Sequence, residues 1–237
     1  MPGRFRSIID WLGAHGGIVI GAVLVVVLGT WGFIGLADEV SEGDTQHFDD
    51  WAIRRLRRPD DPATPIGPKW LAEVGRDLTA LGGVAVLSIV TGIVVGYYLI
   101  LGKRNAAIFV LFATLGGLIL STLLKHLFDR PRPQLVPHLS QVYTSSFPSG
   151  HSMLAATVYL TLGSLLMRLA PKKRLKLYYL LVAWTLTVLI GLSRVYMGVH
   201  YPTDVLAGWT AGLVWALLCW LTARALQHRG AVEKDIE

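Results

Sequence analysis

Charge is scarce in this chain of 237 residues. Aspartate, glutamate, lysine and arginine together account for 16% of it, whereas soluble proteins average about 25%. Hydrophobic residues make up 53%, and many of them are gathered in long runs. This combination argues against a soluble protein and predicts a membrane protein.

Cysteine is nearly absent. The single residue, Cys219, lies within an apolar run, so no disulfide can form within the chain and no redox compartment is indicated. We expect Cys219 to be a small buried hydrophobic side chain. The sequence also lacks a carboxylate cluster suited to Mg²⁺, and we predict neither a metal site nor another cofactor.

Six apolar runs are long enough for a helix to cross a bilayer, which takes about 20 residues. The predicted spans cover about residues 16–37, 81–101, 106–127, 149–169, 177–193 and 202–226. The sequence thus predicts an all-α polytopic bundle, with residues 1–237 forming one membrane-embedded domain. The first run is longer than the core of a signal peptide, although Leu36-Ala37 leaves processing open.

Basic residues gather at the N-terminus, in the 102–105 and 168–176 loops and in the C-terminal tail. Six spans place all four segments on one side, which the positive-inside rule assigns to the cytoplasm. The net charge of +6 is then explained by topology and anionic lipid rather than by nucleic acid. We expect a multi-pass protein of the inner (cytoplasmic) membrane, with both termini cytoplasmic and no obligate protein partner.

The segment 38–80 is expected on the outer side. There Trp51, Ile53 and Leu56 are interleaved with four arginines, a pattern that predicts a short helix lying in the membrane interface. Within the spans, three pairs of glycines spaced four apart predict close contacts between helices. These pairs are Gly17 and Gly21, Gly92 and Gly96, and Gly208 and Gly212.

Three short polar clusters stand where apolar runs begin or end. They are Lys125 with Arg132-Pro133, then Pro148-Ser149-Gly150-His151, then Ser193-Arg194 with His200 and Asp204. Ionisable residues beside membrane-spanning runs are costly and usually functional. All three clusters fall on the outer side, so we interpret them as one site.

The second cluster opens a predicted helix. A helix start offers free backbone N–H groups and a partial positive charge, which suit a phosphate group. Gly150 allows an anion to approach the backbone, the Ser149 hydroxyl adds a hydrogen-bond donor, and His151 can supply a proton.

The third cluster places His200 just before the last span and Asp204 in its first turn. A carboxylate at that spacing can bind one imidazole nitrogen and leave the other nitrogen as a nucleophile or base. Lys125, Arg132 and Arg194 add positive charge from three segments, and arginine matches phosphate oxygens in a fork. Together these residues suit phosphoryl transfer, which depends on positioning and charge stabilisation.

These motifs resemble those of the type 2 phosphatidic acid phosphatase superfamily, the membrane lipid phosphate phosphatases. The resemblance implies that His200 attacks phosphorus to form a phosphohistidine, that Asp204 orients it and that His151 protonates the leaving oxygen. It further implies that no metal is needed. The residues implied to hold the phosphate are Lys125, Arg132, Ser149, Gly150 and Arg194.

Alternatives remain for both function and substrate. A vanadium-dependent haloperoxidase uses a similar pocket for vanadate, but such enzymes are typically soluble. A non-catalytic lipid-phosphate binding or transport protein would not need the His200–Asp204 pair. We favour undecaprenyl pyrophosphate as substrate, then phosphatidylglycerol phosphate, ahead of phosphatidic acid and phosphorylated lipid A. Arg130 is expected to be a loop or headgroup residue, and His138 and Tyr143 are weaker candidates for substrate contact.

Overall fold

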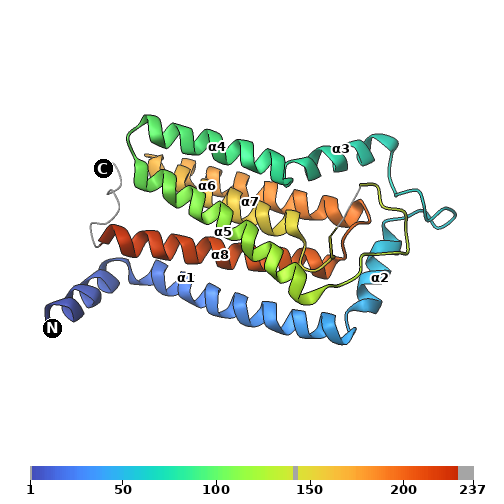
Figure 1. Cartoon of the computed structure of the whole chain (residues 1–237), viewed down its shortest axis with the longest axis horizontal. Coiled ribbons are helices and arrows are strands. Elements are labelled where there is room, and N and C mark those ends of the chain that lie inside the picture. Colours follow the sequence, from blue (N-terminus) through green and yellow to red (C-terminus); the bar gives the residue numbers. More distant parts are fainter. Residues whose placement is uncertain (1, 141–143, 229–237) are drawn as a thin grey trace.

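The computed structural model describes residues 2–140 and 144–228, and every regular element in those two ranges is a helix. The helices are α1 (Pro2–Glu42), α2 (Gln46–Arg55), α3 (Lys69–Ala80), α4 (Val84–Ile100), α5 (Arg104–Phe128), α6 (Gly150–Leu169), α7 (Lys173–Tyr196) and α8 (Pro202–His228). The long helices run side by side, while α2 and α3 lie at one end of the bundle (Figure 1). The all-α membrane fold predicted from the sequence is thereby confirmed.

Five helices of the described chain are long and apolar enough to cross a membrane: α1 from Gly16, α5, α6, α7 and α8. The α3–α4 pair makes a sixth span if its two helices are taken together. The first span continues to Glu42, beyond the predicted end near residue 37, because the helix does not break where the apolar run stops.

The predicted second span, 81–101, differs from the structure at its start. The helix α4 begins at Val84 and is preceded by α3, and the two are bent by 48° at a break between them. Gly82 and Gly83 lie in that break, where Gly83 is extended with φ −73° and ψ 147°. Glycine favours such an interruption because it lowers helix propensity.

The helix α6 is the centre of the bundle. It packs against α4, α5, α7 and α8, whereas α1 packs mainly against α8. Half of the α6 span is buried inside the protein, compared with 11% of the α1 span. Outward-facing side chains of α1 such as Trp31, which is 74% exposed, are suited to lipid.

Only one of the three glycine pairs forms a close contact within the described residues. A Cβ atom added to Gly208 would lie 2.6 Å from the carbonyl oxygen of Ser149, and one added to Gly212 would lie 2.4 Å from that of Met153. The pairs in α1 and α4, Gly17 with Gly21 and Gly92 with Gly96, have no atom within 4 Å of the added Cβ. The helices α8 and α6 thus approach each other closely at the start of α6.

Candidate active site

The three polar clusters meet at the end of the bundle where α5 and α7 end and where α6 and α8 begin (Figure 1). The charges of Arg132, Arg194, Lys125 and His151 all act on the His200 ring. The predicted residues therefore come from four helices and two loops into one small region.

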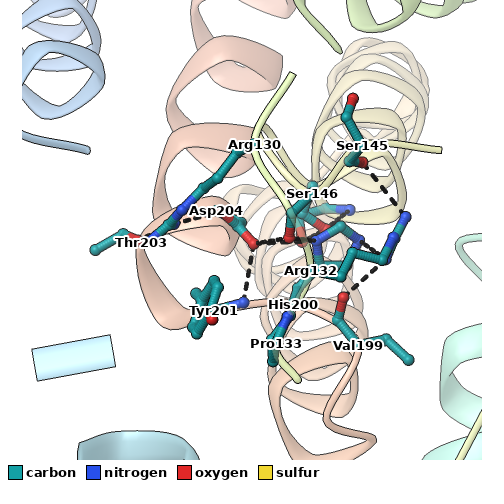
Figure 2. A network of polar contacts seen from close by, with 12 residues as sticks. Arg130, Arg132, Pro133, Ser145, Ser146, Val199, His200, Tyr201, Thr203 and Asp204 are labelled. Carbon is teal, nitrogen blue, oxygen red and sulfur yellow. Dashed lines mark hydrogen bonds and ion pairs between the residues drawn. The ribbon is translucent and has the colours of Figure 1, made fainter. Parts of the chain in front are cut away.

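His200 and Asp204 form the pair expected from their spacing. Nδ1 of His200 is 3.3 Å from Oδ2 of Asp204, and both side chains are buried. The carboxylate also accepts hydrogen bonds from the Ser146 hydroxyl and the Tyr201 backbone N–H. On the other side of the ring, Nε2 lies 3.2 Å from an arginine nitrogen of Arg132 (Figure 2).

This geometry assigns the tautomer of His200. Arginine has no acceptor, so Nε2 must carry the lone pair and Nδ1 the proton. Burial, followed by the positive charges of Arg132 and Arg194, holds the pKa of His200 well below the usual value for histidine. The neutral ring with an unprotonated Nε2 is the form in which histidine acts as a nucleophile.

Lys125 and Arg132 contact backbone carbonyls of the loop before α6. The ammonium of Lys125 donates to Ser145 O at 2.6 Å, and Nε of Arg132 donates to Thr144 O at 2.7 Å. A second guanidinium nitrogen of Arg132 donates to Val199 O at 2.7 Å (Figure 2). The nitrogen donors of Lys125 and Arg132 would suit the oxygens of an anion, and in this structure they are bonded to backbone carbonyl oxygens.

A residue outside the three motifs holds Arg194 in place. It is 2% exposed, and its NH1 donates to the Thr79 hydroxyl at the end of α3 at 2.8 Å. Its Nε is buried without a hydrogen-bond partner. An unpaired buried donor is costly, and a phosphate oxygen would satisfy it.

The start of α6 is fixed by Ser149. Its side chain caps the helix by accepting a hydrogen bond from the Ser152 backbone N–H, and its own N–H donates to Asp204 O at 2.9 Å. A Cβ added to Gly150 would lie 3.2 Å from Cε of Lys125. The absence of a side chain at Gly150 therefore lets Lys125 lie directly against the start of α6.

His151 lies against the break between α3 and α4. A Cβ added to Gly83 would lie 3.9 Å from Nε2 of His151, and one added to Gly82 would lie 3.4 Å from its Cβ. The ring is half-buried. The interrupted span thus provides the wall beside the predicted proton donor.

Arg130 lies in the loop between α5 and α6, as expected, but its partners there were not predicted. Its side chain is 8% exposed and forms ion pairs with Asp204 at 2.7 Å and with Asp49 of α2 at 2.8 Å. Sequence reasoning missed Asp49, Thr79 and Ser146 altogether, because each belongs to a segment without a motif. His138 contacts Pro133 O within its own loop, and Tyr143 lies outside the described residues.

Comparison with known proteins identifies the family to which this chain belongs. The model of the PAP2 superfamily matches residues 106–227. The chain is 36% identical to phosphatidylglycerophosphatase B of Bacillus subtilis over 154 residues, which cover 64% of the chain and 75% of that relative. It is 29% identical over 183 residues to the "Putative undecaprenyl-diphosphatase YbjG" of Escherichia coli, covering 70% and 81%.

A solved structure extends the likeness to most of the bundle. The crystal structure of a transmembrane PAP2 type phosphatidylglycerolphosphate phosphatase from Bacillus subtilis aligns with a TM-score of 0.74 and 29% identity. The alignment covers 85% of this chain and 96% of that one. The motifs, the family match and the shared fold agree, and the chain belongs to the PAP2 superfamily.

Proposed function

We propose that this chain is an integral membrane phosphatase that hydrolyses a phosphomonoester or diphosphate of a membrane lipid through a phosphohistidine on His200. The observation that carries the proposal is the His200–Asp204 pair, in which the unprotonated Nε2 of His200 lies beside the guanidinium of Arg132. The names of the relatives, a phosphatidylglycerophosphatase and an undecaprenyl-diphosphatase, support a lipid phosphate as the substrate.

In the first step, Nε2 of His200 attacks phosphorus and the bond to the leaving oxygen breaks. His151 donates a proton to that oxygen, so the lipid leaves as an alcohol or a monophosphate. The ring becomes positively charged when the N–P bond forms, because Nδ1 keeps its proton. The carboxylate of Asp204 stabilises this charge.

In the second step, water attacks the phosphohistidine while His151 takes up a proton from it. The N–P bond breaks, orthophosphate leaves and His200 returns to its neutral form. The phosphate oxygens would replace the loop carbonyls on Lys125 and Arg132 and would pair with the free Nε of Arg194. The backbone at Gly150 and the Ser149 side chain complete the proposed phosphate cradle.

We further propose that the site opens at the outer (periplasmic) leaflet of the cytoplasmic membrane. A lipid held in that leaflet can present its headgroup without leaving the bilayer. The sequence alone favoured undecaprenyl pyrophosphate, but the two Bacillus subtilis comparisons favour phosphatidylglycerol phosphate as the first substrate to test. Both are retained, since relatives named for each are similar to this chain.

The test is release of orthophosphate from a panel of lipids by the purified protein in detergent. The panel holds phosphatidylglycerol phosphate, undecaprenyl pyrophosphate, phosphatidic acid and phosphorylated lipid A. Activity should survive excess EDTA, because lysine and arginine supply the charge that a metal would otherwise provide. His200→Ala should abolish turnover, and His126→Ala, which changes an exposed histidine on α5, is the matched control.

Other outcomes would point to the alternatives. A wild-type protein that binds these lipids without releasing phosphate would indicate a binding or transport function. Halide oxidation that depends on added vanadate would indicate a haloperoxidase.

A further inference from the structure

Arg130 connects the catalytic pair to a helix far away in the sequence. Its NH1 donates to Oδ1 of Asp204 at 2.7 Å, and its NH2 donates to Oδ2 of Asp49 at 2.8 Å (Figure 2 shows the Asp204 side). The guanidinium also lies over the Tyr201 ring, 4.3 Å from its centroid. Contacts on several sides thus fix Arg130, which bridges the carboxylates of Asp204 and Asp49.

Asp49 is the outer member of this chain of contacts. It is fully buried and accepts hydrogen bonds from both the backbone N–H and the hydroxyl of Thr203. Those bonds tie α2 to the first turn of α8, next to the residue that orients His200. Asp49 lies outside the segment 106–227 that the family model matches.

The charges explain why the three residues act together. Burial alone would lower the pKa of Arg130, but the carboxylates of Asp204 and Asp49 outweigh this effect and raise it. A buried carboxylate that loses its cation is strongly destabilised. Without Arg130, Oδ1 of Asp204 would lose its cation, and a rotation of the carboxylate toward another donor would displace Oδ2 from Nδ1 of His200.

We propose that Arg130 and Asp49 are positioning residues for the nucleophile, so that α2 belongs to the catalytic apparatus. This inference rests on the proposed phosphatase function. Arg130 holds Oδ1 of Asp204 and leaves Oδ2 to bind Nδ1 of His200. Asp49 fixes both Arg130 and the start of α8, and neither residue contacts the phosphate.

The test compares Arg130→Lys, Asp49→Asn and the double variant in phosphate release. Lysine has one nitrogen and cannot bridge both carboxylates, and asparagine keeps the shape of Asp49 without its charge. Each variant should lower kcat by about 10- to 100-fold, because a nucleophile displaced by an ångström loses that much rate. The inhibition constant for orthophosphate should not change, because the phosphate cradle is intact. The double variant should be no slower than Arg130→Lys, since both changes act through one carboxylate.

Asp50→Asn is the matched control. Asp50 is the next residue of α2, and its carboxylate accepts a hydrogen bond from Gln46, which the asparagine oxygen can still accept. This variant should keep wild-type kcat. Wild-type kcat in Arg130→Lys and Asp49→Asn would overturn the inference, as would a loss that disappears when rates are normalised to folded protein. A wild-type protein without phosphatase activity would instead refute the proposed function.

Discussion

At the scale of single residues, Arg194 is the most enclosed of the three cations predicted to bind phosphate. Its NH1 is held by Thr79, while its Nε has no partner. This arrangement holds the guanidinium fork in place and leaves its Nε as an unpaired donor. A lysine ammonium could not reproduce that fork.

We therefore predict that Arg194→Lys lowers kcat/KM by about 100-fold or more, the usual loss when one transition-state donor is removed. The measurement is steady-state phosphate release by detergent-solubilised protein. Arg174→Lys, at the exposed start of the same helix, should behave as wild type. Wild-type turnover in Arg194→Lys would show that this residue does not clamp the phosphate.

The protonation of His200 gives a second prediction. Burial and the neighbouring cations lower its pKa, so the ring should stay neutral at pH values where an exposed histidine, with a pKa of about 6.5, is already protonated. Nitrogen NMR of histidine-labelled protein should show that the His200 ring remains neutral between about pH 5 and 7. His200→Asn would identify the signal by its loss. A His200 ring that titrates near pH 6.5 or above would contradict the proposed environment.

The site contacts that could be predicted from the sequence are those between residues that lie near each other in the chain. His200 and Asp204 are four residues apart across a helix start, so their contact follows from local geometry. Arg130 and Asp49 are 81 residues apart, and no local spacing links them. Arg130 is the loop residue that the sequence predicted, but its ion pair with Asp49 could not be predicted because Asp49 lies in a segment that carries no motif.

At the scale of elements, the close packing of α8 on α6 connects the bundle to the site. Gly208→Ala would place a methyl group 2.6 Å from the Ser149 carbonyl and 3.0 Å from the Cβ of Ser152. The start of α6 would have to move. We predict a loss of stability of about 1–3 kcal/mol, as for other overpacked sites, together with reduced kcat.

Thermal unfolding in detergent and phosphate release measure the two effects. Gly92→Ala is the matched control, since an added Cβ there meets no atom within 4 Å. It should leave kcat unchanged and should not lower the melting temperature, because alanine favours the helix more than glycine does. A Gly208→Ala protein with wild-type melting temperature and kcat would show that the helix start tolerates displacement.

The α3–α4 break shows where element prediction reaches its limit. An apolar run reports that a segment is buried in lipid, but it does not report a bend between two helices. Gly82-Gly83 gave a local signal for an interruption. At the break, Thr79 contacts Arg194 and Gly83 lies beside His151. Contacts between segments so far apart in the chain cannot be predicted from the local sequence.

At the scale of the whole molecule, the positive-inside rule and the assembled site both bear on which side of the membrane the site faces. The site gathers at the end of the bundle that carries α2 and α3 (Figure 1). The basic loop before α7, which includes Lys172, is separated from the site by the length of α6 and of α7. An outer-facing site therefore requires this loop to be cytoplasmic, as its charge predicts.

Cysteine labelling in intact bacterial cells tests this orientation. Ala63→Cys and Lys172→Cys both replace exposed residues, and the native Cys219 is 3% exposed, so it should add little background. A membrane-impermeant maleimide should label position 63 in intact cells and position 172 only after permeabilisation. Both positions should react in permeabilised cells, which controls for access to the thiol. Labelling of position 172 but not 63 from outside would invert the topology and place the proposed phosphatase site at the cytoplasmic leaflet, where it would meet a different pool of lipid phosphates.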